Sequence, residues 1–131
     1  MIKHFRGETK LAERRILREG AKDDSVKLAR FDLMPADVLW ELACLYGTGA
    51  IKYDERNWEL GIKYGRVYGA LNRHLKLWWL GEEQNKNNKQ HHLDSVIWNA
   101  MALRAYQLRG MSSFDDRPNR PFQKGGTPVA N

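Results

Sequence analysis

The sequence has 131 residues, a formal net charge of +6 and one cysteine, Cys44. This length is typical of a single domain with its own core, and one cysteine excludes an intrachain disulfide or a multi-cysteine zinc site. The apolar runs are too short to span a membrane, and the first residues lack the apolar stretch of a secretory signal. We therefore expect a soluble cytoplasmic protein with no membrane partner.

The excess positive charge lies near the N-terminus. Residues 1–30 hold nine Lys/Arg and five Asp/Glu, whereas residues 31–110 hold ten and nine. An interface that neutralises several phosphates usually concentrates its basic residues on one surface. The nearly neutral body does not favour nucleic acid as a partner, so any such binding is expected from the basic arm alone.

Apolar periodicity predicts an all-α fold, a bundle of three main helices with an N-terminal helical arm and an irregular C-terminal tail. The main helices are expected over residues 36–46, 64–80 and 91–109, and a further helix over residues 8–19 of the arm. Residues 47–61 lose the helical period and are predicted as a loop with at most one short turn. Residues 81–90 are predicted as a polar loop.

Three regions follow from this pattern: a basic helical arm (1–24), an all-α domain (25–110) and a tail that contains Pro and Gly (111–131). Three helices form a thin core for five Trp, five Tyr and four Phe. A monomer would therefore expose apolar surface around Trp58, Trp78 and Trp79. We expect a homo-oligomer, a dimer or a tetramer.

The last predicted helix carries one narrow polar strip on an otherwise apolar circumference. His92, Ser95 and Asn99 share this strip at spacing i, i+3, i+7, and Tyr106 continues it. Such a strip faces solvent or a polar cavity, and helical bundles present metal ligands from one helix at i and i+3. Asp94 falls almost opposite His92, and we interpret it as a first-turn residue that interacts favourably with the helix dipole.

Residues 49–58 place a cation, aromatic rings and an amide in one irregular segment. Lys52 could hold a phosphate, Tyr53 or Trp58 could stack on a base, and Asn57 could read base edges, which are the groups that a purine nucleotide needs. A turn stabilised by a buried tryptophan explains the same residues. Both interpretations stay open at this point.

Three polar residues on the first two main helices also have ordinary structural explanations. Glu41 lies at the edge of an apolar stripe, where a glutamate is commonly exposed. His74 lies between two apolar stripes, as a hydrogen-bonded core histidine would. Arg73 points elsewhere and fits a surface charge.

Taken in chain order, these segments resemble a known family. The series is Arg30-Phe31-Asp32-Leu33-Met34-Pro35, Glu41, Gly49-Ala50-Ile51-Lys52-Tyr53, Asn57-Trp58, Arg73-His74, Gly81-Glu82 and His92-Leu93. It is similar to the dATP/dGTP diphosphohydrolase N-terminal family of phages and bacteria, grouped with the MazG-like all-α nucleotide pyrophosphohydrolases. The resemblance covers residues 30–110.

The resemblance implies hydrolysis of a purine (deoxy)nucleoside triphosphate to the monophosphate and pyrophosphate, with Mg²⁺ or Mn²⁺ as cofactor. This activity belongs to phage or bacterial nucleotide metabolism, in the cytoplasm of the bacterium or of the phage's host. It makes residues 25–110 a nucleotide-binding domain. The catalytic candidates are Glu41, His74 and Glu82, and the metal-ligand candidates are these three with His92. The substrate-binding candidates are Lys52, Tyr53, Asn57, Trp58, Arg73, Ser95 and Asn99.

Two alternatives remain. The chain contains neither the E-x-x-E nor the E-x-x-D pair of MazG-type enzymes, and His92-x-x-Ser95 stands where the second pair is expected. Asn85 stands three residues after Glu82, where the family often has an acidic residue. These departures favour the first alternative, a non-catalytic nucleotide-sequestering protein on the same scaffold. A nucleic-acid binder with a basic arm is the second. An HD-type phosphohydrolase is not favoured, because the chain has no His-Asp dipeptide.

Overall fold

The computed structural model describes residues 27–118. The chain divides into two units, one ending at Met34 and one beginning at Pro35. The described part of the first unit holds the single turn η1 (Phe31–Leu33), beside which the Arg30 guanidinium donates two hydrogen bonds of 2.7 and 2.8 Å to the Asp32 carboxylate. The arm helix predicted over residues 8–19 and the tail after residue 118 lie outside the described residues.

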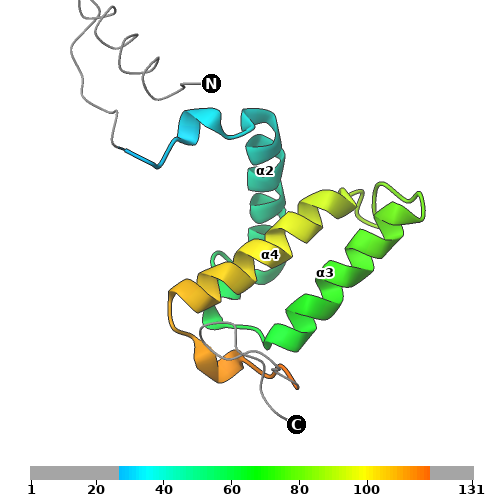
Figure 1. Ribbon diagram of the computed structural model, residues 1–131. Helices are drawn as coiled ribbons and strands as arrows, with labels where there is room; N and C mark the ends of the chain where they lie inside the picture. The colour runs from blue at the N-terminus through cyan, green and yellow to red at the C-terminus, as the bar shows by residue number, and fades with distance from the viewer. Residues whose placement is uncertain (1–26, 119–131) are drawn as a thin grey trace, which may run out of the picture. The chain divides into compact units, whose positions relative to one another are not determined.

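The described part of the second unit is helical. Its elements are α2 (Ala36–Tyr53), η2 (Asn57–Leu60), α3 (Tyr64–Trp79), α4 (His92–Leu108) and η3 (Ser112–Phe114). Figure 1 shows α3 and α4 side by side, and α4 also contacts α2. The predicted all-α fold with three main helices is confirmed, since residues 27–118 contain no strand. None of these described helices is long and apolar enough to cross a bilayer.

Helix α2 continues well beyond the predicted end near residue 46. The loop prediction for residues 47–53 is wrong, because the helix runs through Gly47, Thr48 and Gly49 to Tyr53. The Thr48 side-chain hydroxyl donates to the Cys44 carbonyl one turn earlier, a contact that the helical backbone permits. Glycine costs about 1 kcal/mol in a helix interior relative to alanine, and here the partly buried face of α2 offsets that cost. After the end of α2, the short helix η2 (Asn57–Leu60) corresponds to the one short turn that was predicted within residues 47–61.

The end of α3 sets the position of Glu82. Gly81 has φ of +102°, a conformation that favours glycine. The amide of Gly81 donates to the Trp78 carbonyl, and the amide of Glu82 donates to the Leu77 carbonyl. This pair of hydrogen bonds is a Schellman motif, which terminates the helix and directs the next residues back along it. The predicted polar loop, residues 81–90, then leads to α4, whose first turn is capped by His91.

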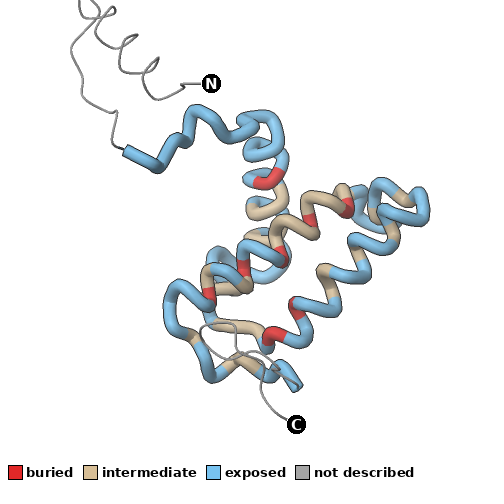
Figure 2. Tube along the Cα trace, in the orientation of Figure 1, coloured by how far each residue is buried: buried red, intermediate tan, exposed pale blue. Residues whose placement is uncertain are grey.

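The core lies between α3 and α4, and the buried residues in Figure 2 are concentrated on α4. Tyr64, Val67, Ala102 and Tyr106 form its buried cluster. The rings of Tyr64 and Tyr106 stack with centroids 6.1 Å apart. The Tyr106 hydroxyl also donates a 2.6 Å hydrogen bond to the Trp58 carbonyl, which fastens η2 to α4.

Residues after α4 also pack against this core. Phe114 in η3 lies against Tyr106 with ring centroids 6.4 Å apart. The hydroxyl of Tyr64 donates to the Met111 carbonyl, and the Asp116 carboxylate accepts the amide of Gly65 at the start of α3. The first residues of the segment predicted as an irregular tail therefore form part of the packed unit.

Candidate functional site

A cavity of about 1140 Å³ opens among the end of α2, η2, and the facing sides of α3 and α4. Tyr46, Trp58 and Trp98 line it with ring centroids 6.0 to 6.5 Å apart, and we call it the aromatic pocket. Small-molecule sites commonly have volumes of roughly 300–1,000 Å³ and aromatic walls with a few polar groups. This pocket is large enough for a ligand with several chemical groups.

Most of the sequence-derived candidates meet in the aromatic pocket. The following line it together: Lys52, Tyr53, Asn57, Trp58, His74, Ser95 and Asn99. Arg73 does not line it and is exposed on α3. Glu41, Glu82 and His92 also lie outside its lining.

The polar strip of α4 is buried and supplies one wall of this pocket. Ser95 and Asn99 are each 7% exposed. The Asn99 side-chain amide donates a 2.7 Å hydrogen bond to the Ser95 carbonyl, which assigns the Asn99 nitrogen because a carbonyl only accepts. Asn99 Oδ1 accepts no hydrogen bond from residues 27–118. In this range every fully buried side-chain N or O atom has a hydrogen-bond partner, so Asn99 Oδ1 is not fully buried. Asn99 Oδ1 is therefore an accessible acceptor in the pocket wall.

The cations of the pocket differ in how far they are already paired. Arg56 pairs with Glu59 at 3.2 Å, and Glu59 also pairs at 3.6 Å with Arg109, which does not line the pocket. The Lys52 ammonium lies over the Tyr53 ring. Within the described part of the chain, neither Lys52 nor Arg66 forms an ion pair with an acidic side chain. Lys52 and Arg66 are therefore the positive charges available to an anionic ligand.

Sequence reasoning missed three residues of this pocket. Tyr46 and Trp98 belong to the apolar periodicity that predicts the helices, and Arg66 was not singled out, yet all three line the pocket. The signal for Arg66 was its spacing, because Arg66, Ala70 and His74 recur every four residues and so share one face of α3. Tyr46 could not be placed without knowing that α2 continues past it toward η2.

A hydrogen-bonded chain connects Glu82, His92 and His74. The Glu82 carboxylate lies 2.8 Å from His92 Nε2, and His92 Nδ1 lies 2.9 Å from His74 Nδ1. His92 is 0% exposed, so both of its ring nitrogens are used inside the protein. Burial lowers the pKa of His74, and His92 and Arg73 lower it further.

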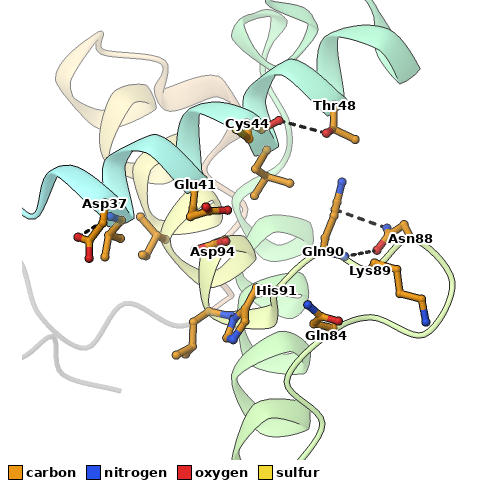
Figure 3. Close-up of a pocket in the computed structure, with 14 residues that line it drawn as sticks. Asp37, Glu41, Cys44, Thr48, Gln84, Asn88, Lys89, Gln90, His91 and Asp94 are labelled. Carbon is orange, nitrogen blue, oxygen red and sulfur yellow. Dashed lines mark hydrogen bonds between the residues drawn. The ribbon is translucent and has the colours of Figure 1, made fainter.

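A second cavity, of about 690 Å³, lies between α2 and the start of α4. Asp37 and Glu41 line it from α2, and Asp94 lines it from α4; we call it the acidic pocket. Figure 3 shows these carboxylates together with His91. Asp94 lies in the first turn of α4, as predicted, where it interacts favourably with the helix dipole. It also lines the same pocket as Glu41.

The four predicted metal ligands do not form one group. Glu41 lines the acidic pocket, whereas His74, Glu82 and His92 belong to the hydrogen-bonded chain. The Nδ1 atoms of the two histidines point at each other at hydrogen-bond distance, so neither is directed at a common third atom. Within residues 27–118, no three or more His, Cys, Asp or Glu residues are grouped so that they could hold a metal ion. As arranged here, the predicted ligand set does not fit a resident metal.

Comparison with known families adds one finding. The sequence model of the family described as "dATP/dGTP diphosphohydrolase, N-terminal" matches residues 18–117. The chain belongs to this family. No curated protein and no solved structure matches the chain. The family match includes η1 and all three main helices, and so spans both pockets.

Proposed function

We propose that the protein hydrolyses a purine (deoxy)nucleoside triphosphate to the monophosphate and pyrophosphate, and that the aromatic pocket binds the nucleotide. We place this activity in phage or bacterial nucleotide metabolism. The family's description supports hydrolysis of dATP or dGTP. The observation that carries the assignment is the meeting of seven sequence-derived candidates in one aromatic-walled pocket.

The chemistry of the pocket suits the parts of such a nucleotide. The rings of Tyr46, Trp58 and Trp98 offer faces and edges to a purine. Asn99 Oδ1 is an acceptor for a base N–H. Lys52 and Arg66 can offset the charge of the phosphate oxygens, which is the main electrostatic requirement of phosphoryl chemistry.

A turnover assay with defined products tests the proposal. Each deoxynucleoside and ribonucleoside triphosphate is incubated with the protein and Mg²⁺, Mn²⁺ or EDTA, and pyrophosphate and orthophosphate are measured separately. We expect pyrophosphate from dATP or dGTP and little from pyrimidine nucleotides. Orthophosphate as the first product would contradict cleavage at the α-phosphorus. The dependence on Mg²⁺ or Mn²⁺ stays a prediction, which the EDTA reaction measures.

The second candidate function is nucleotide sequestration without turnover. The feature that favours it is the absence, within residues 27–118, of an acidic or histidine group that could hold a metal ion. Isothermal titration calorimetry separates the two functions. Stoichiometric binding of a purine triphosphate with no pyrophosphate release under any of the ion conditions would favour sequestration.

A further inference from the structure

The hydrogen-bonded chain from Glu82 through His92 to His74 determines which nitrogen of His74 carries a proton. An ionised carboxylate only accepts hydrogen bonds, so the 2.8 Å contact with Glu82 requires a proton on His92 Nε2. In a neutral imidazole the other nitrogen is then an acceptor. His92 Nδ1 therefore accepts from His74 Nδ1 across 2.9 Å. When both rings are neutral and Glu82 is ionised, no other arrangement satisfies both bonds.

His74 Nε2 is consequently left as a lone-pair acceptor. This nitrogen has no hydrogen-bond partner among residues 27–118. Every fully buried side-chain N or O atom in this range has a partner, so an atom without one must be at least partly exposed. His74 Nε2 is therefore accessible, and the His74 side chain lines the aromatic pocket. The available cations Lys52 and Arg66 line the same pocket. His74 thus brings an accessible basic nitrogen to the wall of the cavity that we assign to the triphosphate.

The surroundings hold this arrangement in place. His92 has no exposed surface, and its backbone amide donates to the Glu83 carbonyl at 2.9 Å. Glu82 is held by the Schellman motif at the end of α3. The other oxygen of the Glu82 carboxylate lies 3.9 Å from the Lys86 ammonium. Neither Glu82 nor His92 lines the aromatic pocket, so their effect on a ligand passes through His74.

We propose that Glu82 and His92 are positioning residues that keep the Nε2 lone pair of His74 in the aromatic pocket, where it takes the proton of the attacking water. The inference rests on the proposed hydrolysis. It assigns the predicted metal-ligand residues His74, Glu82 and His92 to proton transfer instead.

The proposed step is balanced. The water oxygen forms a bond to the α-phosphorus as one water proton moves to His74 Nε2. The bond between the α-phosphorus and the oxygen that bridges to the β-phosphorus breaks, and pyrophosphate leaves with that electron pair. The His74 imidazolium keeps its Nδ1–H bond to His92 and then releases the Nε2 proton to solvent. General-base catalysis of this kind typically contributes about 10²- to 10⁴-fold in rate.

The first test reads the tautomer of His74 directly and needs no activity. Long-range ¹H–¹⁵N NMR spectra are recorded on the full ¹⁵N-labelled protein at pH 8 without nucleotide, and His74 is assigned by its loss in His74→Gln. We expect protonated Nδ1 and unprotonated Nε2. Glu82→Gln, whose amide can donate to His92, should convert His74 partly or wholly to the Nε2–H form. An Nε2–H tautomer in the unchanged protein would overturn the inference.

The second test uses kinetics with a matched control. Glu82→Gln should lower kcat by about 10-fold or more and leave KM within about 2-fold, because a positioning residue acts on the chemical step. Glu82→Asp should restore part of the loss, since it keeps the carboxylate. The control Glu83→Gln makes the same charge change one residue away, at an exposed side chain, and should keep the kcat of the unchanged protein.

The outcomes separate the inference from the proposed function. An active enzyme in which Glu82→Gln and Glu83→Gln have equal kcat would overturn the positioning role, whatever the tautomer. If the unchanged protein releases no pyrophosphate from any nucleotide, the proposed function fails, and with it the base role. The NMR spectra would then still show whether the chain sets the tautomer of His74.

Discussion

At the scale of single residues, the aromatic pocket distinguishes charges that are available from charges that are already paired. Arg56 is paired with the Glu59 carboxylate, so an anionic ligand in the pocket would have to compete for it. Arg66 has no such partner among the described residues and projects from the face of α3 that also carries His74. The pairing of each arginine, more than its presence, therefore decides which one can bind phosphate.

We predict that Arg66→Gln weakens binding of a purine triphosphate. Hydrogen bonds to charged groups contribute about 1.5–3 kcal/mol, which corresponds to roughly a 10- to 100-fold increase in Kd. Calorimetry measures the change. Arg104→Gln is the matched control, since Arg104 is an exposed arginine of α4 outside both pockets, and its Kd should stay within about 2-fold. Equal effects of the two substitutions would remove Arg66 from the phosphate site.

Glu41→Gln should separate stability from metal use. Glu41 is exposed on α2, so the free energy of unfolding should change by no more than about 0.5 kcal/mol. Because Glu41 lines the acidic pocket and not the aromatic pocket, loss of turnover that depends on Mg²⁺ or Mn²⁺ in this variant would show that the acidic pocket holds the ion, since a neutral amide is a poor ligand for a hard dication. Thermal melts and the pyrophosphate assay check both expectations. Full turnover in this variant would exclude Glu41 from the site.

At the scale of elements, the same residue type has opposite roles in different helices and turns. Gly61 follows η2 with φ of +102°, and a Cβ there would collide with the Phe114 ring. Gly69, inside α3, would place a Cβ in open space. Gly61 is therefore required by both its conformation and the packing of η3, whereas Gly69 weakens its helix for no packing reason.

We expect Gly61→Ala to destabilise the protein and Gly69→Ala to stabilise it. A strained backbone conformation costs about 1–3 kcal/mol, and displacement of Phe114 adds to this cost. Alanine in a helix interior is favoured over glycine by about 1 kcal/mol. Urea unfolding monitored by tryptophan fluorescence measures both changes. A Gly61→Ala protein as stable as the unchanged one would contradict the observed packing of η3.

At the scale of the whole molecule, large apolar side chains stay exposed on one face of α3. Tyr68, Leu75 and Trp79 are 65%, 41% and 79% exposed. Their spacing of seven and four residues places them on one stripe of the helix. Meanwhile the most buried positions of α4 include His92, Ser95 and Asn99. The single chain thus buries polar groups and leaves apolar surface uncovered, as subunits of oligomers do.

We predict a homo-oligomer, a dimer or a tetramer, that covers this stripe. Light scattering at micromolar concentration should give a mass of two or four chains. Trp79→Lys should shift the mass toward the monomer, because it places a charge in the contact. Gln107→Lys makes the same charge change at an exposed position of α4 and should keep the oligomer. A stable monomer of the unchanged protein would contradict this prediction.

The sequence by itself determined the helices and their ends where local signals are strong. Apolar periodicity located α3 and α4, and Gly81 and Gly110 mark their ends because only glycine readily adopts a positive φ. The same reasoning ended α2 too early. The Gly-Thr-Gly segment has low helix propensity, and burial of one face of α2, which propensity does not include, overrides it.

The sequence also supplied most of the nucleotide candidates, because Lys52, Asn57 and Trp58 lie close together in the chain. Only the tertiary structure decided which distant residues meet. The packing of α3 on α4 joins His74 to His92 and brings Arg66 into the aromatic pocket. The packing of α2 on α4 places Glu41 in the acidic pocket, apart from these histidines. Helical periodicity assigns a residue to a face, but the partner of that face depends on contacts between helices far apart in the sequence.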